Sequence, residues 1–131
     1  MDKMLITQLK AISAKCGWDF SENEGRMALR IPVEENRQQV VCVTQDHDIA
    51  GQVIARFWTF IGPAEGIDPV KCLNKNAEFA YGSFAIQGDD LVLVDTQLVS
   101  EATPLQLTSA ISNLASYADL CEEQWFRADK Y

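Results

Sequence analysis

The sequence has little of what an enzyme active site is usually built from. It contains a single histidine, His47, no GxGxxG, P-loop or HExxH pattern, and no serine or cysteine in a nucleophile-elbow context. Catalysis needs a nucleophile, a base and a charge stabiliser that converge. The aspartates beside His47 could orient its imidazole, but a cluster of this kind between two strands is typical of a solvated turn. We therefore predict no catalytic residue and no enzymatic activity, and an enzyme built on His47 is the least favoured hypothesis.

Metal ligands and cofactor motifs are equally scarce. The aspartates around His47 begin like an EF-hand calcium loop, but Ala50 and Phe57 occupy the positions of the third carboxylate and of the closing bidentate glutamate. The adjacent Asp89 and Asp90 follow a glycine and fit the turn of a tight hairpin. We expect neither a metal nor a cofactor.

Positive charge and long hydrophobic runs are also lacking. The 131 residues carry 11 basic and 19 acidic side chains, a formal net charge of −8, which repels phosphate backbones and anionic lipid surfaces. No apolar run approaches the ~20 residues that cross a bilayer, and the first residues show no basic region followed by an apolar core. We therefore expect a cytoplasmic protein whose partners include neither nucleic acid nor a membrane.

Paired cysteines are absent as well. Cys16, Cys42, Cys72 and Cys121 stand singly, with no CxxC motif. We predict reduced, mostly buried thiols, with Cys16 and Cys121 packed as small hydrophobes on apolar helix faces. No disulfide staple is needed, because 131 residues of which 47% are hydrophobic suffice for the core of one domain over residues 1–131.

What the sequence does contain is a regular succession of helical and strand patterns. Apolar residues at helical spacing predict a first helix over 2–16, a short helix that starts at Pro69 behind an Asp68 cap, and a last helix that starts at Pro104. Apolar stretches predict strands at 18–21, 27–33, 39–44, 53–61, 81–87 and 91–99, with a loop over 45–51. The predicted buried stripes of the three helices are Leu5, Leu9, Ile12 and Cys16; Val70, Leu73 and Ala77; and Leu107, Ile111, Leu114, Ala118, Cys121 and Trp125.

The order of these elements, α-β-β-β-β-α-β-β-α, indicates the fold class. The links between them are too short for the crossovers that parallel strands need. We therefore predict an α+β domain with an antiparallel sheet of about five to six strands and three helices.

The strand over 53–61, VIARFWTFI, differs from an ordinary half-buried strand. Side chains alternate across a pleat, so Ile54, Trp58 and Phe60 point away from the side on which Phe57 lies. Both faces of the strand therefore carry large apolar groups. Either a helix covers the second face, or that face binds a second copy of the chain or another protein.

The last helix has an unusually neutral surface. Residues 104–118, PLQLTSAISNLASYA, contain no charged side chain, although a solvated helix face normally carries lysine and glutamate. We predict a second contact surface there, and a neutral but solvated face is an equally good interpretation. Its residues are Ser109, Ser112, Asn113, Ser116 and Tyr117.

The segment over 53–123 resembles a known family. The asparagines within LNKNAEFAYGSFAI, the strand DDLVLVDTQL and the proline-started helix that ends in DLCEE are similar to YbjN-type proteins, which are related in fold to type III secretion chaperones of the Tir-chaperone class. The resemblance implies a small, acidic, non-enzymatic α+β protein that holds another polypeptide. It also implies a homodimer, because the secretion chaperones are typically dimeric.

Two hypotheses follow for the function. The leading one is a chaperone-like protein-binding domain, dimeric, which uses apolar surface around Ile54, Trp58 and Phe60 to hold a client polypeptide or itself. The alternative is a small regulatory protein of a signalling pathway that binds one folded partner.

Overall fold

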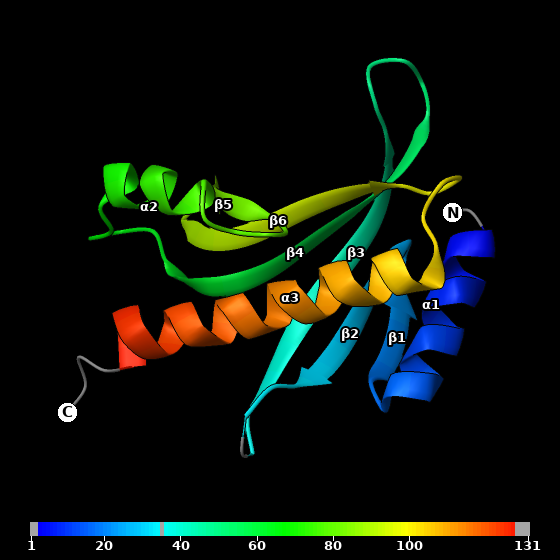
Figure 1. The fold of residues 1–131 in the computed structure, drawn as a ribbon, viewed down its shortest axis with the longest axis horizontal. Helices are drawn as coiled ribbons and strands as arrows, with labels where there is room; N and C mark the ends of the chain where they lie inside the picture. The colour runs from blue at the N-terminus through cyan, green and yellow to red at the C-terminus, as the bar shows by residue number, and fades with distance from the viewer. Residues whose placement is uncertain (1–2, 35, 128–131) are drawn as a thin grey trace.

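A computed structural model describes residues 3–34 and 36–127 of the chain. Figure 1 shows a twisted sheet with helix α3 crossing in front of it. The element order confirms the predicted fold class and strand number. The helices and strands are α1 (Lys3–Cys16), β1 (Asp19–Asn23), β2 (Arg26–Pro32), β3 (Gln38–His47), β4 (Val53–Pro63), α2 (Pro69–Asn76), β5 (Ser83–Gln87), β6 (Asp90–Leu98) and α3 (Pro104–Glu122), which continues as a π-helical turn, Glu123–Arg127.

The six strands form one antiparallel sheet in the order β1-β2-β3-β4-β6-β5. The hairpin between β1 and β2 turns at Glu24 and Gly25, whose φ angles of 51° and 81° suit the mirror-image turn that matches strand twist. Strand β3 is longer than predicted. Gln45, Asp46 and His47 pair with β4 and are not part of a loop, because the partner strand extends the ladder past the apolar stretch.

All three helices pack against the same face of the sheet. The core joins Leu5, Leu9 and Ile12 of α1, Cys72 of α2 and the predicted stripe of α3 to one side of the strands. On that side the strands contribute Met27, Leu29, Ile31, Val41, Val43, Ala55, Phe57, Ile61, Phe84, Leu91 and Leu93. The sheet therefore has a helix-covered face and a second face that contributes nothing to this core.

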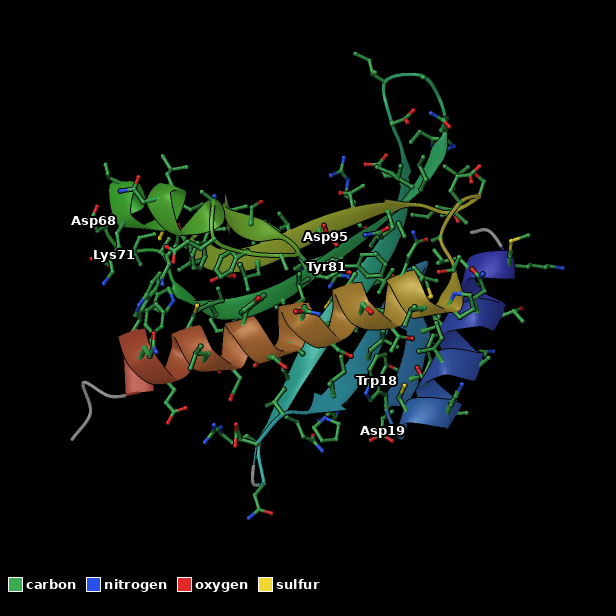
Figure 2. All side chains as sticks on the ribbon, in the orientation of Figure 1. Trp18, Asp19, Asp68, Lys71, Tyr81 and Asp95 are labelled. Atoms are coloured by element: carbon green, nitrogen blue, oxygen red, sulfur yellow. The ribbon has the colours of Figure 1, made fainter. Side chains whose placement is uncertain are left out.

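The caps predicted for α2 and α3 are present. The carboxylate of Asp68 accepts hydrogen bonds from the backbone N–H groups of Val70 and Lys71 at the start of α2 (Figure 2). Thr103 and Gln106 form a reciprocal capping box at the start of α3, with Pro104 in its first turn. These local signals fix where the helices begin.

The predicted buried stripe of α2 was wrong, and that of α1 was wrong at its last residue. In α2, Val70 and Leu73 are 64% and 68% exposed, and Ala77 is exposed as well. The buried residue of this helix is Cys72, which is 5% exposed. A helix of eight residues has room for one contact with the sheet, and α2 turns its Cys72 side to the core. In α1, Cys16 is exposed because it lies at the last residue of the helix, beyond the stripe that ends at Ile12 and Ser13.

The strand predicted at 81–87 begins two residues late. Gly82 has a φ of 83°, and a Cβ added there would lie 2.7 Å from Leu114 Cδ1 and 2.9 Å from the carbonyl oxygen of Val94. The chain thus passes tightly between α3 and β6 before β5 starts at Ser83. The backbone N–H of Phe84 then donates to Asn76 Oδ1 at 2.6 Å, which ties the start of β5 to the end of α2.

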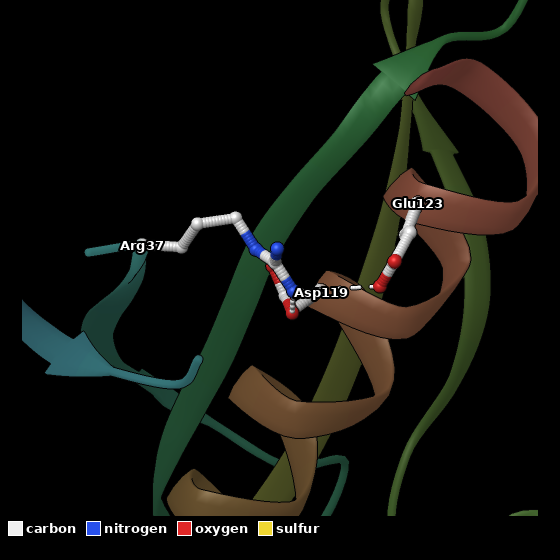
Figure 3. Close-up of polar contacts among 3 residues, drawn as sticks. All are labelled: Arg37, Asp119 and Glu123. Atoms are coloured by element: carbon white, nitrogen blue, oxygen red, sulfur yellow. Dashed lines mark hydrogen bonds and ion pairs between the residues drawn. The ribbon is translucent and has the colours of Figure 1, made fainter. Parts of the chain in front are cut away.

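A charged contact positions the second half of α3. The guanidinium of Arg37, between β2 and β3, donates to both carboxylate oxygens of Asp119 at 3.1 and 2.9 Å (Figure 3). Asp119 is 4% exposed, whereas Glu123, 3.4 Å from Arg37, is exposed. Hydrogen bonding to Asp119 raises the pKa of Arg37. The contact joins residues 82 apart in the sequence and holds α3 over the sheet.

Candidate protein-binding surface

Strand register identifies the residues on the face without helices. They alternate with the core residues along each strand and pair with one another across strands. We call this surface the open face. Its residues include Asp19, Ser21 and Asn23 in β1; Arg26, Ala28, Arg30 and Pro32 in β2; Gln38, Val40, Cys42, Thr44 and Asp46 in β3; Ile54, Arg56, Trp58 and Phe60 in β4; Asp90, Val92, Val94, Thr96 and Leu98 in β6; and Ser83, Ala85 and Gln87 in β5.

The middle of the open face is apolar. Trp58 lies between Cys42 and Val94 in register, and Phe60 pairs with Val92. Phe60 is 48% exposed, and Val40, on the neighbouring strand, is 40% exposed. Neither Trp58 nor Phe60 packs against the core beneath the helices. Large apolar side chains are thus left at the surface without a covering element, which is typical of an interaction site.

Ile54 lies at one end of this surface and is 5% exposed. Its register partners are Asp46 and Leu98, and it lies outside the cluster of core residues beneath the helices. Of the three sheet residues predicted as the site, Trp58 is partly exposed and Phe60 is about half exposed, whereas Ile54 is buried.

Charged residues on the open face are partly paired. Arg56 Nε donates to Asp46 Oδ2 at 3.0 Å. The pKa of Asp46 is lowered by the hydrogen bond from the His47 backbone N–H and by Arg56. Arg26 reaches across β3 and places its guanidinium carbon 5.3 Å from the centre of the Trp58 ring, within the range of a cation–π contact.

The open face is hollowed where β1, β2 and β3 meet. The hollow has a volume of about 420 Å³. Its lining is mainly polar and consists of Asp19, Ser21, Arg30 and Gln38 together with Phe20, Ala28 and Val40. Figure 2 labels Asp19 at the start of β1.

The neutral surface of α3 lies on the other side of the sheet from the open face. Ser116 is exposed, and Ser109, Ser112, Asn113 and Tyr117 are partly buried. Asn113 Nδ2 donates to the carbonyl oxygen of Ser109 at 2.7 Å, and the Tyr117 ring lies 4.9 Å from that of Phe79. The structure therefore does not bring the two predicted groups of site residues together.

Sequence reasoning missed a second apolar surface beside α2. A groove of about 250 Å³ runs between α2 and strands β5 and β6, and Cys72, Leu73, Phe84 and Ile86 lie along it. Ile86 is 57% exposed. The groove was missed because Leu73 was assigned to the buried stripe of α2. The signal that could have found it is the length of α2, since a helix of eight residues, about two turns, cannot bury two apolar sides against one sheet.

The carboxylates on either side of His47, where β3 turns into β4, accept hydrogen bonds from backbone N–H groups. Asp48 Oδ1 accepts hydrogen bonds from the N–H groups of Ala50 and Gln52, and Asp46 Oδ1 accepts one from the His47 N–H. Within residues 3–34 and 36–127, no group of three or more metal-ligating side chains comes together. No helix in this part of the chain is long and apolar enough to cross a membrane.

Comparisons with known proteins agree with this architecture. No family model and no curated protein sequence matches the chain. A chain of the HopA1–SchA chaperone–effector complex is similar in structure, with a TM-score of 0.66 at 10% identity over 92% of this chain and 94% of that chain. A chain of the complex between the Yersinia pestis type III secretion chaperone SycH and a fragment of YscM2 is similar with a TM-score of 0.61 at 16% identity over 88% and 97%.

These similarities define the class of fold. The three helices and the six-stranded antiparallel sheet match the fold of type III secretion chaperones, as predicted. The relation to YbjN-type proteins stays a prediction, since no family model matches.

Proposed function

We propose that this chain is a non-enzymatic, chaperone-like domain that holds a client polypeptide on the open face of its sheet. The observation that carries the proposal is the placement of Trp58, Phe60 and Val40 outside the core, on a face that no part of the core covers. Exposed apolar side chains on a sheet can pack against the alternating side chains of an extended segment. The similarity to chains of two chaperone complexes supports the same role. We expect the domain to act in the cytoplasm, where its unpaired cysteines stay reduced.

The domain also pairs with a second copy of itself in this proposal. The groove beside α2 is the surface for that contact, because Leu73 and Ile86, which line it, are each more than half exposed, as is Val70 on the same helix. Exposed apolar groups on a short helix and an edge strand are a liability unless another surface covers them. A homodimer built there leaves the open face free for a client. The neutral surface of α3, where Ser116 is exposed, lies on the other side of the sheet and remains a second proposed contact surface.

The test measures client binding and molar mass on the same variants. The client is reduced, carboxymethylated α-lactalbumin, an unfolded soluble polypeptide, and its binding is followed by fluorescence anisotropy. Trp58→Asp should weaken binding roughly tenfold or more, the loss typical of a central aromatic contact. The matched control Leu73→Asp changes an exposed side chain of α2 and should keep client binding. It should lower the mass from twice 14.6 kDa to the monomer value.

Circular dichroism shows whether each variant is folded. If Trp58→Asp unfolds the chain, Trp58 is structural, and Phe60→Asp replaces it because Phe60 is about half exposed. Full client binding by a folded Trp58→Asp variant, or by Phe60→Asp where it replaces that variant, would contradict the proposal. A stable complex with one folded protein and none with unfolded α-lactalbumin would favour the regulatory alternative.

A further inference from the structure

Helix α1 carries a charge opposite in sign to that of the chain. Its 14 residues, Lys3–Cys16, include three lysines and no acidic residue, whereas the whole chain has 11 basic and 19 acidic side chains. The acidic excess of the chain therefore lies entirely outside this helix. Figure 1 shows α1 beside β1, at one end of the layer of helices.

The three lysines, Lys3, Lys10 and Lys15, are exposed and have no acidic partner. Among the described residues, no carboxylate oxygen lies within 4.0 Å of their Nζ atoms. Lys10 Nζ lies 5.8 Å from the centre of the Phe20 ring on β1, a contact with one side of the ammonium group that leaves donors on its other side available. Unpaired positive charge is thus concentrated on one helix of an acidic protein.

The lysines lie on both sides of the exposed surface of α1. Lys3 and Lys10 are seven residues apart, which places them about two turns and ~10 Å apart on the same side of the helix. Lys15 lies on the other side of that surface, because five residues from Lys10 correspond to about 140° of rotation. The exposed residues between the two sides are Thr7, Ala11 and Ala14. They are uncharged and short, so the main chain of a partner can approach the helix with lysines on either side.

The start of α1 adds positive charge to this surface. The N–H groups in the first turn of a helix carry partial positive charge, which an acidic residue normally offsets. The first turn of α1 contains no acidic residue and begins with Lys3. This placement weakens the isolated helix, and a carboxylate supplied by a partner would offset both charges.

We infer that the exposed surface of α1 binds an acidic segment of a protein partner through these three lysines. The surface is separate from the open face, because the helices cover the other side of the sheet, so the inference goes beyond the proposed function. Nucleic acid and an anionic membrane fit less well. Both extend far beyond a helix about 21 Å long and would meet the acidic remainder of the molecule.

The test uses three peptides of about twelve residues with a neutral fluorophore. The first alternates glutamate with alanine, and the second and third have glutamine or lysine in place of glutamate. Binding to the whole chain is measured by fluorescence anisotropy at low salt. The variants are Lys3→Glu, Lys10→Glu, Lys15→Glu and the triple reversal. The matched control, Arg30→Glu, reverses an exposed arginine of the open face that likewise forms no ion pair with a described residue.

The glutamate peptide should bind most tightly and the lysine peptide least. Each lysine reversal should weaken the glutamate peptide roughly two- to fivefold, and the triple reversal tenfold or more. Arg30→Glu should change its affinity less than about twofold, because salt screens a charge on the far side of the sheet. Circular dichroism checks the fold, and glutamine replaces glutamate at the three positions if the triple variant unfolds.

Equal affinities for the glutamate and glutamine peptides would overturn the inference. An equal loss in Arg30→Glu and in the lysine variants would overturn it too, since net charge alone would then account for binding. Tighter binding of an oligonucleotide or of phosphatidylserine vesicles through the same lysines would overturn the choice of a protein partner. A fall in molar mass on reversal of the lysines would assign the surface to a second copy of the chain and overturn it as well. Client binding through Trp58 decides the proposed function separately.

Discussion

Phe57 and Trp58 are adjacent in β4 and point to opposite faces of the sheet, so their replacement by alanine compares the two faces directly. Phe57 is fully buried in the core beneath the helices. Truncation of such a side chain leaves a cavity and costs about 3–5 kcal/mol of unfolding free energy. Trp58 is partly buried by its neighbours on the open face and does not pack against the core.

Water can occupy the space that Trp58→Ala leaves, because no element lies above it. The cost then lacks the cavity contribution and consists of lateral apolar contacts and the cation–π contact with Arg26, together about 1–2 kcal/mol. We therefore expect Phe57→Ala to cost at least ~2 kcal/mol more than Trp58→Ala. Urea unfolding followed by far-ultraviolet circular dichroism measures both, since tryptophan fluorescence is itself altered by the second variant. Equal costs would refute the reasoning, because they would mean that Trp58 is part of a covered core.

Four further predictions concern residues outside the open face. Gly82→Ala should destabilise the fold by roughly 3 kcal/mol, against about 1 kcal/mol for Gly51→Ala. Both glycines have a φ of 83°, but of the two only Gly82 would place its new Cβ within 4 Å of other atoms. Equal losses of unfolding free energy in urea would contradict this. Asn76→Ala should cost about 1 kcal/mol in the same assay, because the Phe84 N–H loses its acceptor, and no loss would show that water replaces it. Thiol labelling of the folded protein at pH 8 should modify exposed Cys16 well before buried Cys121, whose pKa is raised by burial to about 11. In the folded state the Cys121 thiol keeps its proton above the ordinary pKa of 9.0. Its contribution to stability is therefore present below pH 9 and is lost as pH rises towards 11. Urea unfolding curves that do not change between pH 9 and pH 11 would contradict the raised pKa of Cys121.

Most of the fold follows from local patterns in the sequence. Side chains that point to the two faces of the sheet alternate clearly in the strand VIARFWTFI and in the strands beside it. The caps at Asp68 and Thr103 mark where helices begin without any tertiary information. The long last helix buries its predicted stripe because nineteen residues repeat one apolar face often enough to fix its orientation. For α2 the same reasoning fails, because eight residues contain too few repeats to decide between the Cys72 side and the Leu73 side.

The candidate site was predictable only in part. Alternation in β4 shows that both faces carry apolar groups, but which face receives the helices depends on contacts between distant segments. The pairing of Arg37 with Asp119, 82 residues away, is one such contact and leaves no local trace in the sequence. The cation–π contact of Arg26 with Trp58 likewise requires β2, β3 and β4 to be placed side by side.

The measurement that tests the central claim most directly follows the three tryptophan indole N–H signals of the chain by nuclear magnetic resonance. Trp18 and Trp125 pack against the core, and Trp58 does not. On titration with unfolded, carboxymethylated α-lactalbumin, we predict that the Trp58 signal shifts or broadens while the other two stay in place. Movement of the Trp18 or Trp125 signal alone, or of none of the three, would contradict binding on the open face.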